Sequence, residues 1–344
     1  MDFLGFLIIC VKVLVVFSAT MLTVLMMVYA ERRVSAFMQG RLGPNRVGPQ
    51  GLLQPIADGI KFLMKEDIIP AGVNKPIYLL APAMLLIPAL MTFAVIPFGS
   101  TITLFGREVP LQVADLNVGI LYILALTSIG VYGLVLAGWA SNSKYSLIGG
   151  LRSSAQLISY ELAMGLSVVS VILLAGSLKL NVIVEDQQGY LLSWNVFKQP
   201  VAFLIFLVAV YAETNRLPFD LTEAEQELVG GYHTEYSSMK FAMFFTAEYA
   251  NMVTAAALTV TLFFGGWDVP LLNETSMGAL GAILSVLSFI LKTAFFLFLF
   301  IWVRWTFPRF RYDQLMKLGW KVMLPLALIN IFVTGGYLTL TSLR

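Results

Sequence analysis

The stretch NVGILYILALTSIGVYGLVLAGWA, residues 117–140, contains no aspartate, glutamate, lysine or arginine. A helix of about 20 apolar residues crosses the ~30 Å hydrocarbon core of a bilayer, so this stretch indicates a transmembrane helix. The whole chain has the same character, because 58% of its 344 residues are hydrophobic, 12% are charged and the mean hydropathy is +0.83. This composition excludes an ordinary soluble domain.

Seven further stretches share these properties, although the fifth is short. The eight candidate spans are 4–30, 77–98, 117–140, 154–176, 199–213, 239–265, 282–306 and 322–341. No polar segment between them is long enough to build a second core. We therefore predict an all-α polytopic membrane protein with about eight transmembrane helices, forming a single membrane domain over residues 1–344.

Basic residues indicate the orientation of these spans. Of the 22 lysines and arginines, 16 lie in or beside the odd-numbered connections, and three lie in the even-numbered ones. Lysine and arginine accumulate on the cytoplasmic side of membrane proteins. We expect both termini outside and the odd-numbered connections on the cytoplasmic face or its organellar equivalent.

The first of these connections contains an amphipathic segment. Gly-Pro pairs at 43–44 and 48–49 interrupt the first helix, and a helix is predicted over about 51–66. Its apolar side chains fall on one face; they are Leu52, Leu53, Ile56, Ile60, Leu63 and Met64. Such a helix lies in the membrane interface. This helix either lies on the surface without a further role, or it covers a side entrance through which a lipid-soluble substrate reaches the protein.

The stretch AETNRLPFDLTEAEQELVGGYHTEY, residues 212–236, belongs to a predicted acidic inner loop over about 212–238. It holds one base, Arg216, and six of the 20 acidic residues: Glu213, Asp220, Glu223, Glu225, Glu227 and Glu235. Asp220 and Glu223 fit a helix capping box, but capping does not account for the remaining acids. Carboxylates held close together resist full ionisation. This loop is therefore predicted to take up and release protons.

Charged residues inside the spans extend this interpretation. Glu161 and Glu248 lie roughly 12 and 15 Å from the inner face at ~1.5 Å per residue, and Glu213 ends the fifth span. Charged groups in membranes typically face polar interiors or proton and ion routes. We predict a relay from Glu213 through Glu248 and Glu161. For Lys292, near the middle of the seventh span, a static ion pair with Glu248 is the alternative to a functional role.

Several classes of site are not expected in this chain. It has one cysteine and one histidine, whereas iron–sulfur clusters, haem and zinc sites need more ligands of these types. Nucleotide-binding fingerprints are missing from the sequence. The net charge of +2 gives no indication of nucleic acid. We expect no metal and no catalytic residue here.

Three stretches together resemble one family. They are ERRVSAFMQGRLGPNRVGPQGLLQPIADGIKFLMKE, AETNRLPFDLTEAEQELVGGYHTEYSSMKFAMFFTAEYANM and RWTFPRFRYDQLMKLGWK. They are similar to the membrane subunit of NADH–quinone oxidoreductase (respiratory complex I) that carries the letter H in bacteria and the number 1 in mitochondria. The likeness covers effectively the whole chain. The length is more typical of the bacterial protein, which implies the bacterial inner (plasma) membrane; the mitochondrial inner membrane is the alternative.

The resemblance implies a quinone tunnel that couples quinone reduction to proton translocation, with its mouth framed by residues 4–30, 51–66 and 239–265. Residues implied to line the tunnel are Arg32, Arg41, Asp58, Phe241, Phe245 and Arg304. The implied proton path comprises Glu161, Glu213, Asp220, Glu223, Glu225, Glu227 and Glu248. The implied partners are a hydrophilic quinone-reducing arm and antiporter-like membrane subunits. Quinone is then the substrate, and NADH, FMN and iron–sulfur clusters belong to the partner subunits.

Three alternatives remain at this point. A homologous protein could anchor a membrane-bound hydrogenase or a dehydrogenase that uses ferredoxin or cofactor F420, because these side chains do not fix the electron donor. A stand-alone cation/proton antiporter would exchange ions when purified by itself. A purely structural scaffold fits the acidic loop poorly.

Overall fold

The computed structural model describes residues 3–104, 107–220, 229–270, 272 and 278–342. Within these ranges six helical segments are long and apolar enough to cross a membrane. They are α1 (Phe3–Met38), α3 with the turn that follows it (Lys75–Ala94), α4 (Gly119–Ala140), α5 (Lys144–Ala175), α11 (Gly278–Thr306) and the C-terminal segment Tyr312–Ser342. The predicted all-α polytopic membrane class is confirmed.

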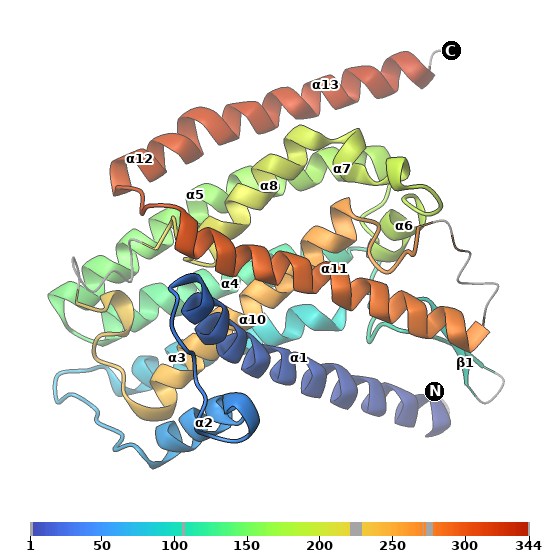
Figure 1. Ribbon diagram of the computed structural model, residues 1–344. Helices are drawn as coiled ribbons and strands as arrows, with labels where there is room; N and C mark the ends of the chain where they lie inside the picture. Colours follow the sequence, from blue (N-terminus) through green and yellow to red (C-terminus); the bar gives the residue numbers. More distant parts are fainter. Residues whose placement is uncertain (1–2, 105–106, 221–228, 271, 273–277, 343–344) are drawn as a thin grey trace.

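Two more helices coincide with the remaining predicted spans. Helix α8 (Pro200–Glu213) is apolar but only 14 residues long, and α10 (Ser238–Phe263) has 26 residues. The total of eight spans and the outward position of the termini stay predictions. In Figure 1 both ends of the chain lie toward the right-hand side, and α2 and the turns that join α1 to α3 lie at the left.

Some helices extend beyond the predicted spans. Helix α1 continues to Met38 rather than residue 30, and α5 begins at Lys144 rather than residue 154. Apolar patterning marks only the part of a helix that faces hydrocarbon. The helix itself continues into the polar interface, where backbone hydrogen bonds form equally well.

Short elements connect the long helices. Strands β1 (Thr101–Leu104) and β2 (Arg107–Pro110) form an antiparallel hairpin that the hydropathy pattern did not indicate. Short helices and turns are α6 (Leu180–Glu185), α7 (Asn195–Lys198) and single turns at Pro49–Gly51, Leu191–Ser193 and Gly231–His233. The C-terminal segment comprises α12 (Tyr312–Lys317), a π-helical turn (Leu318–Met323) and α13 (Leu324–Ser342).

Helix α10 lies at the centre of the molecule. Every residue from Met252 to Phe263 is buried, and the run includes three consecutive alanines at 255–257. Small side chains let neighbouring helices approach closely in a membrane. The glycines of α4 act in the same way, because a Cβ on Gly138 would lie 2.5 Å from the Ser146 carbonyl oxygen of α5.

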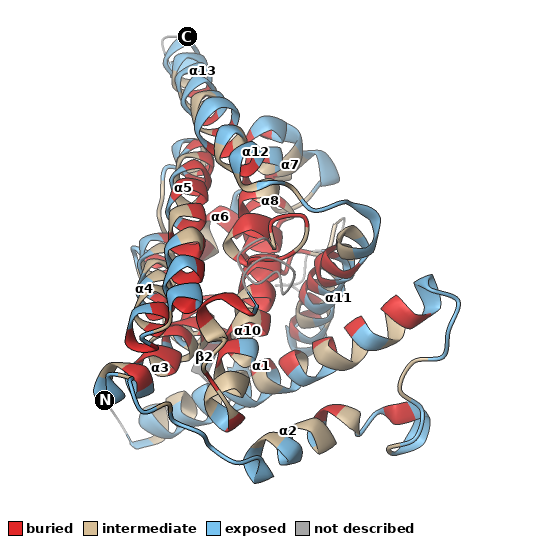
Figure 2. Cartoon of the chain, turned by 90° about the vertical axis from the view of Figure 1, so that its left-hand side faces the viewer, coloured by how far each residue is buried: buried red, intermediate tan, exposed pale blue. Residues whose placement is uncertain are grey.

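The predicted amphipathic helix is present as α2, Gln54–Met64. Its apolar side chains are not covered by the rest of the chain, since Ile60 is 51% and Met64 83% exposed. Figure 2 shows α2 beside α1 at the edge of the molecule, with exposed and intermediate residues along it. Hydrogen bonds from Tyr29 to the Gln50 carbonyl (2.9 Å) and from Ser238 to the Phe62 carbonyl (2.8 Å) attach it to α1 and α10.

Candidate functional site

Three carboxylates from three helices line one cavity. Glu161 of α5, Glu213 at the end of α8 and Glu248 of α10 meet there with Thr127 and Asn251. The cavity measures about 30 Å³, which is room for about two water molecules at roughly 10–15 Å³ each. A neighbouring cavity of about 20 Å³ is also lined by Thr127, Glu213 and Asn251. The structure thus brings together the three acids predicted to form a relay.

The end of α8 is held in place by α5. The Gln156 amide nitrogen donates to the carbonyls of Ala212 (2.8 Å), in the last turn of α8, and Phe219 (3.0 Å), in the segment that follows. The Asn215 amide donates to the Ser153 hydroxyl at 3.3 Å. These contacts fix Glu213 in the cavity that Glu161 also lines, because Gln156 and Glu161 belong to the same helix. On the far side, the Ser128 hydroxyl of α4 donates to Glu161.

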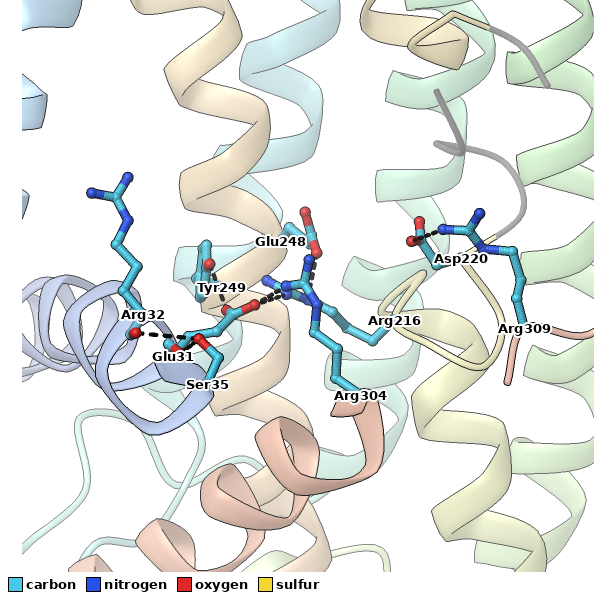
Figure 3. Close-up of polar contacts among 9 residues, drawn as sticks. All are labelled: Glu31, Arg32, Ser35, Arg216, Asp220, Glu248, Tyr249, Arg304 and Arg309. Atoms are coloured by element: carbon cyan, nitrogen blue, oxygen red, sulfur yellow. Dashed lines mark hydrogen bonds and ion pairs between the residues drawn. The ribbon is translucent and has the colours of Figure 1, made fainter. Parts of the chain in front are cut away.

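A buried ion cluster adjoins the cavity. Arg216 Nε lies 2.6 Å from Glu248 Oε1, and its Nη1 donates to Glu31 Oε1 at 2.9 Å. The Arg304 guanidinium pairs with the same Glu31 oxygen, and the Tyr249 hydroxyl donates to the other at 2.7 Å. Arg216 also stacks over the Tyr249 ring, 4.6 Å from its centroid. Figure 3 shows these side chains converging from α1, α10, α11 and the segment after α8.

Arg216 connects α1 to the carboxylate cavity, two regions whose contact the sequence did not indicate. Its side chain is 8% exposed, and it contacts both Glu31 of α1 and Glu248 of the cavity. Buried ion pairs offset their desolvation cost only when the geometry is good and further hydrogen bonds are made. The bonds to Tyr249 and Arg304 supply such contacts for Glu31.

The acidic stretch is better neutralised than its sequence suggests. Arg309, which follows α11, pairs with Asp220 at 3.0 Å, and Arg216 pairs with Glu31 and Glu248. The fold therefore brings a base from a distant segment to this stretch. Burial raises the pKa of the Asp220 carboxyl, and the Arg309 guanidinium partly offsets that rise.

Part of the predicted proton path lies outside the described residues. Glu223, Glu225 and Glu227 fall within 221–228. The predicted capping box, which needs both Asp220 and Glu223, therefore also stays a prediction.

Most residues implied to line the tunnel gather near α1, α2 and the start of α10. Arg32 pairs with Asp58 at 2.5 Å, and Phe241 and Phe245 pack with ring centroids 4.7 Å apart. In Figure 3 the Arg32 side chain points away from Arg216, whereas Glu31 points toward it. Arg41 lies apart from this group; it is exposed and bonds to Gln39 at 2.7 Å.

An aromatic cluster joins α2 to α10 at this position. Phe62 of α2 lies 6.0 Å from Phe241, and the His233 ring lies 5.3 Å from Phe241 and 6.1 Å from Phe245. Burial lowers the pKa of His233 from 6.5 to about 4. The imidazole is therefore neutral at pH 7 and packs as one member of the cluster.

Lys292 does not pair with Glu248. Its ammonium donates to the carbonyls of Phe264, Gly266 and Asp268 at 2.9, 3.1 and 2.7 Å. Phe264 follows Glu248 by 16 residues of mostly helical chain, which is about 24 Å at ~1.5 Å per residue. Sequence spacing placed both residues near mid-membrane, but it could not show that Lys292 faces the opposite end of α10.

Sequence reasoning missed three members of the ion cluster: Glu31, Arg216 and Tyr249. Glu31 adjoins Arg32 at the end of an apolar run, where a charge is expected at the interface and attracts no notice. Arg216 was noted only as the base within the acidic stretch. Nothing in the linear pattern indicated that these two residues meet.

Known proteins share this sequence over nearly its full length. Residues 11–335 match the family model described as NADH dehydrogenase. The chain is 56% identical over 329 residues to a Geobacter metallireducens protein named as the H 1 subunit of NADH-quinone oxidoreductase, covering 96% of both chains. It is 58% identical over 327 residues to "NADH-quinone oxidoreductase subunit 8" of Rhodothermus marinus, covering 92% of this chain and 93% of the relative.

Proposed function

The chain belongs to the family of the H-type membrane subunit of NADH-quinone oxidoreductase, and from this premise we propose that it forms a quinone tunnel and couples quinone reduction to proton translocation. Membership makes it a membrane subunit of an oxidoreductase complex, in which other complex I subunits are its partners. It is not the catalytic subunit. The tunnel and the proton path are the parts that we propose.

The proposed tunnel begins between α1, α2 and the start of α10. The exposed apolar face of α2 suits contact with lipid, from which a quinone would enter. The neutral aromatic cluster of Phe62, His233, Phe241 and Phe245 offers an apolar surface for a ring or an isoprenoid tail. Arg32, paired with Asp58, fixes α2 against α1 at this entrance.

The proposed proton path is carried by one observation: Glu161, Glu213 and Glu248 line a common cavity inside the helical bundle. Acids inside membrane proteins are costly and typically mark proton or ion routes. Two carboxylates that share a site resist simultaneous ionisation, so a proton gained by one is readily passed to another through water. Asp220 and the acids at 223, 225 and 227 are proposed to feed this cavity from the inner face.

The ion cluster suggests how the two parts communicate. Glu31 and Arg304 lie next to the proposed tunnel, and Arg216 joins Glu31 to Glu248. Quinone reduction changes the charge at the inner end of the tunnel. A rearranged cluster then alters the proton affinity of Glu248, and the proton moves through Glu213 and Glu161 toward the antiporter-like neighbours.

Replacing the cavity acids in the intact complex tests the path. Glu213→Gln and Glu248→Gln keep the side-chain size but cannot carry a proton. We expect both to lower quinone reductase and proton-pumping rates together, by roughly the 10²-fold typical of a lost proton-transfer group. The control is Glu185→Gln, an exposed acid on α6. Unchanged rates in an assembled Glu213→Gln complex would reject the path.

The remaining assignments follow from the same proposal. Quinone is the substrate, and NADH, FMN and the iron–sulfur clusters are carried by partner subunits of the hydrophilic arm. The membrane is the bacterial inner (plasma) membrane, since the relatives described above are bacterial proteins. Their names specify NADH and quinone, so the hydrogenase, ferredoxin and antiporter alternatives are not proposed.

A further inference from the structure

The central helix α10 ends inside the protein. The last four carbonyls of a helix have no partner within that helix, and here side chains of other elements supply one. The Gln187 amide donates to the Thr261 carbonyl at 3.1 Å, and the Asn195 amide donates to the Leu262 carbonyl at 2.9 Å. Gln187 is 0% and Asn195 1% exposed, so protein and not solvent covers this helix end.

After α10 the chain turns three carbonyl oxygens toward one point. Phe264, Gly266 and Asp268 accept hydrogen bonds from the Lys292 ammonium at 2.9, 3.1 and 2.7 Å. The turn depends on Gly266, whose φ is +52° and where a Cβ would lie 2.6 Å from a Val184 methyl carbon. Three carbonyl oxygens thus form a ring around one ammonium, and that of Asp268 also accepts from the Ser288 hydroxyl at 3.0 Å.

The ring lies deep in the bundle. Lys292 follows the start of α11 at Gly278 by 14 residues, or about 21 Å at ~1.5 Å per residue. In Figure 1 α11 continues toward the side of the N-terminus beyond the point where α10 ends. Irregular backbone at membrane depth persists only where protein or a polar cavity surrounds it.

The chemistry of this ring is that of a monovalent-cation site. Helix C-termini carry partial negative charge, and in transporters such helix ends together with unwound carbonyls coordinate Na⁺ or H⁺. Asp268, 1% exposed, belongs to the same turn. The Trp194 ring, whose centroid is 4.7 Å from the ammonium, adds a further surface that attracts cations.

We propose that this is a monovalent-cation site filled permanently by the tethered ammonium of Lys292, which closes the outer end of the bundle to protons and alkali cations. The second cavity reaches Leu258 of α10, six residues or about 9 Å before Phe264. The site therefore lies beyond the carboxylate cavities along the same helix. A fixed positive charge in a pore raises the barrier for other cations.

The test is the passive permeability of the intact complex in liposomes, measured without NADH while a membrane potential is imposed. Proton entry is followed with a pH-sensitive dye and Rb⁺ uptake with a radiotracer. Lys292→Met removes charge and donors, Lys292→Gln removes charge but keeps two amide donors, and Lys292→Arg keeps the charge. Lys12→Gln is the matched control, because Lys12 also lies in a predicted span and donates to a carbonyl, that of Gln112.

We expect Lys292→Met and Lys292→Gln to raise proton or Rb⁺ entry severalfold. Lys292→Arg and Lys12→Gln should match the wild type. Added methylammonium should reduce the leak of Lys292→Met. An assembled Lys292→Gln complex as tight as the wild type would overturn the proposal, and this variant decides alone if Lys292→Met does not assemble. Passive permeability is independent of turnover. The outcome is thus separate from that of Glu213→Gln.

Discussion

At the scale of single residues, the proposed coupling depends on Arg216. A buried guanidinium that contacts Glu31 and Glu248 places the proposed tunnel and the carboxylate cavity in electrostatic contact. A charge exposed to water at the protein surface would be screened and would have little effect on a second charged group. Because this cluster is buried, a change of charge at Glu31 changes the proton affinity of Glu248, and the reverse.

Removing the guanidinium should destabilise the cluster. Arg216→Met leaves Glu31 and Glu248 without this partner, and breaking a buried pair typically costs about 3–5 kcal/mol. We expect a lower unfolding temperature of the purified complex and a lower quinone reductase rate. Adding Glu248→Gln should restore part of the stability, because Glu248 loses its pair with Arg216 whereas Glu31 keeps its pair with Arg304. A double variant no more stable than Arg216→Met would contradict this assignment.

His233 should make stability depend on pH. Its pKa is about 4 in the folded protein against 6.5 unfolded, so the unfolded chain binds the proton more readily below pH 6.5. The stabilisation is fully present above pH 6.5 and is lost as the pH falls toward 4. Unfolding temperatures across this range should fall less steeply for His233→Phe, which keeps the aromatic packing. Parallel curves would show that His233 does not titrate as stated.

At the scale of elements, α2 is held by hydrogen bonds, an ion pair and the Phe62 ring, while most of its apolar face stays exposed. The Gln50 carbonyl, in the turn before α2, accepts from Tyr29 of α1. Within α2, the Phe62 carbonyl accepts from Ser238 of α10 and Asp58 pairs with Arg32. The periodic pattern predicted this helix and its exposed face within three residues at each end. The pattern could not supply the attachments, because they join residues distant in sequence.

Loosening that attachment should affect substrate entry more than chemistry. Asp58→Asn removes the ion pair with Arg32 that holds α2 to α1. We expect the KM for quinone to rise severalfold while kcat changes little, as measured with the reconstituted complex over a range of quinone concentrations. Asp186→Asn, which breaks an exposed pair with Lys198 elsewhere, is the control. A fall in kcat at unchanged KM would place Asp58 in the reaction and not at the entrance.

At the scale of the whole molecule, the sequence predicted the membrane class, because long apolar runs indicate helices that can cross a bilayer. It did not predict which side chains meet. Glu161, Glu213 and Glu248 come from three helices, and their common cavity depends on Gln156 holding the end of α8. Lys292 shows the limit most clearly, since Glu248, the partner considered as one alternative, lies within α10 and its actual partners follow the end of α10.

The central claim is that the cavity acids change protonation during turnover. The most direct measurement is the infrared difference spectrum of the intact complex between oxidised and reduced quinone, recorded in H₂O and D₂O. We predict carboxyl C=O bands that shift in D₂O and are lost in Glu213→Gln or Glu248→Gln. A spectrum without carboxyl bands, or with bands that persist in both variants, would contradict the account.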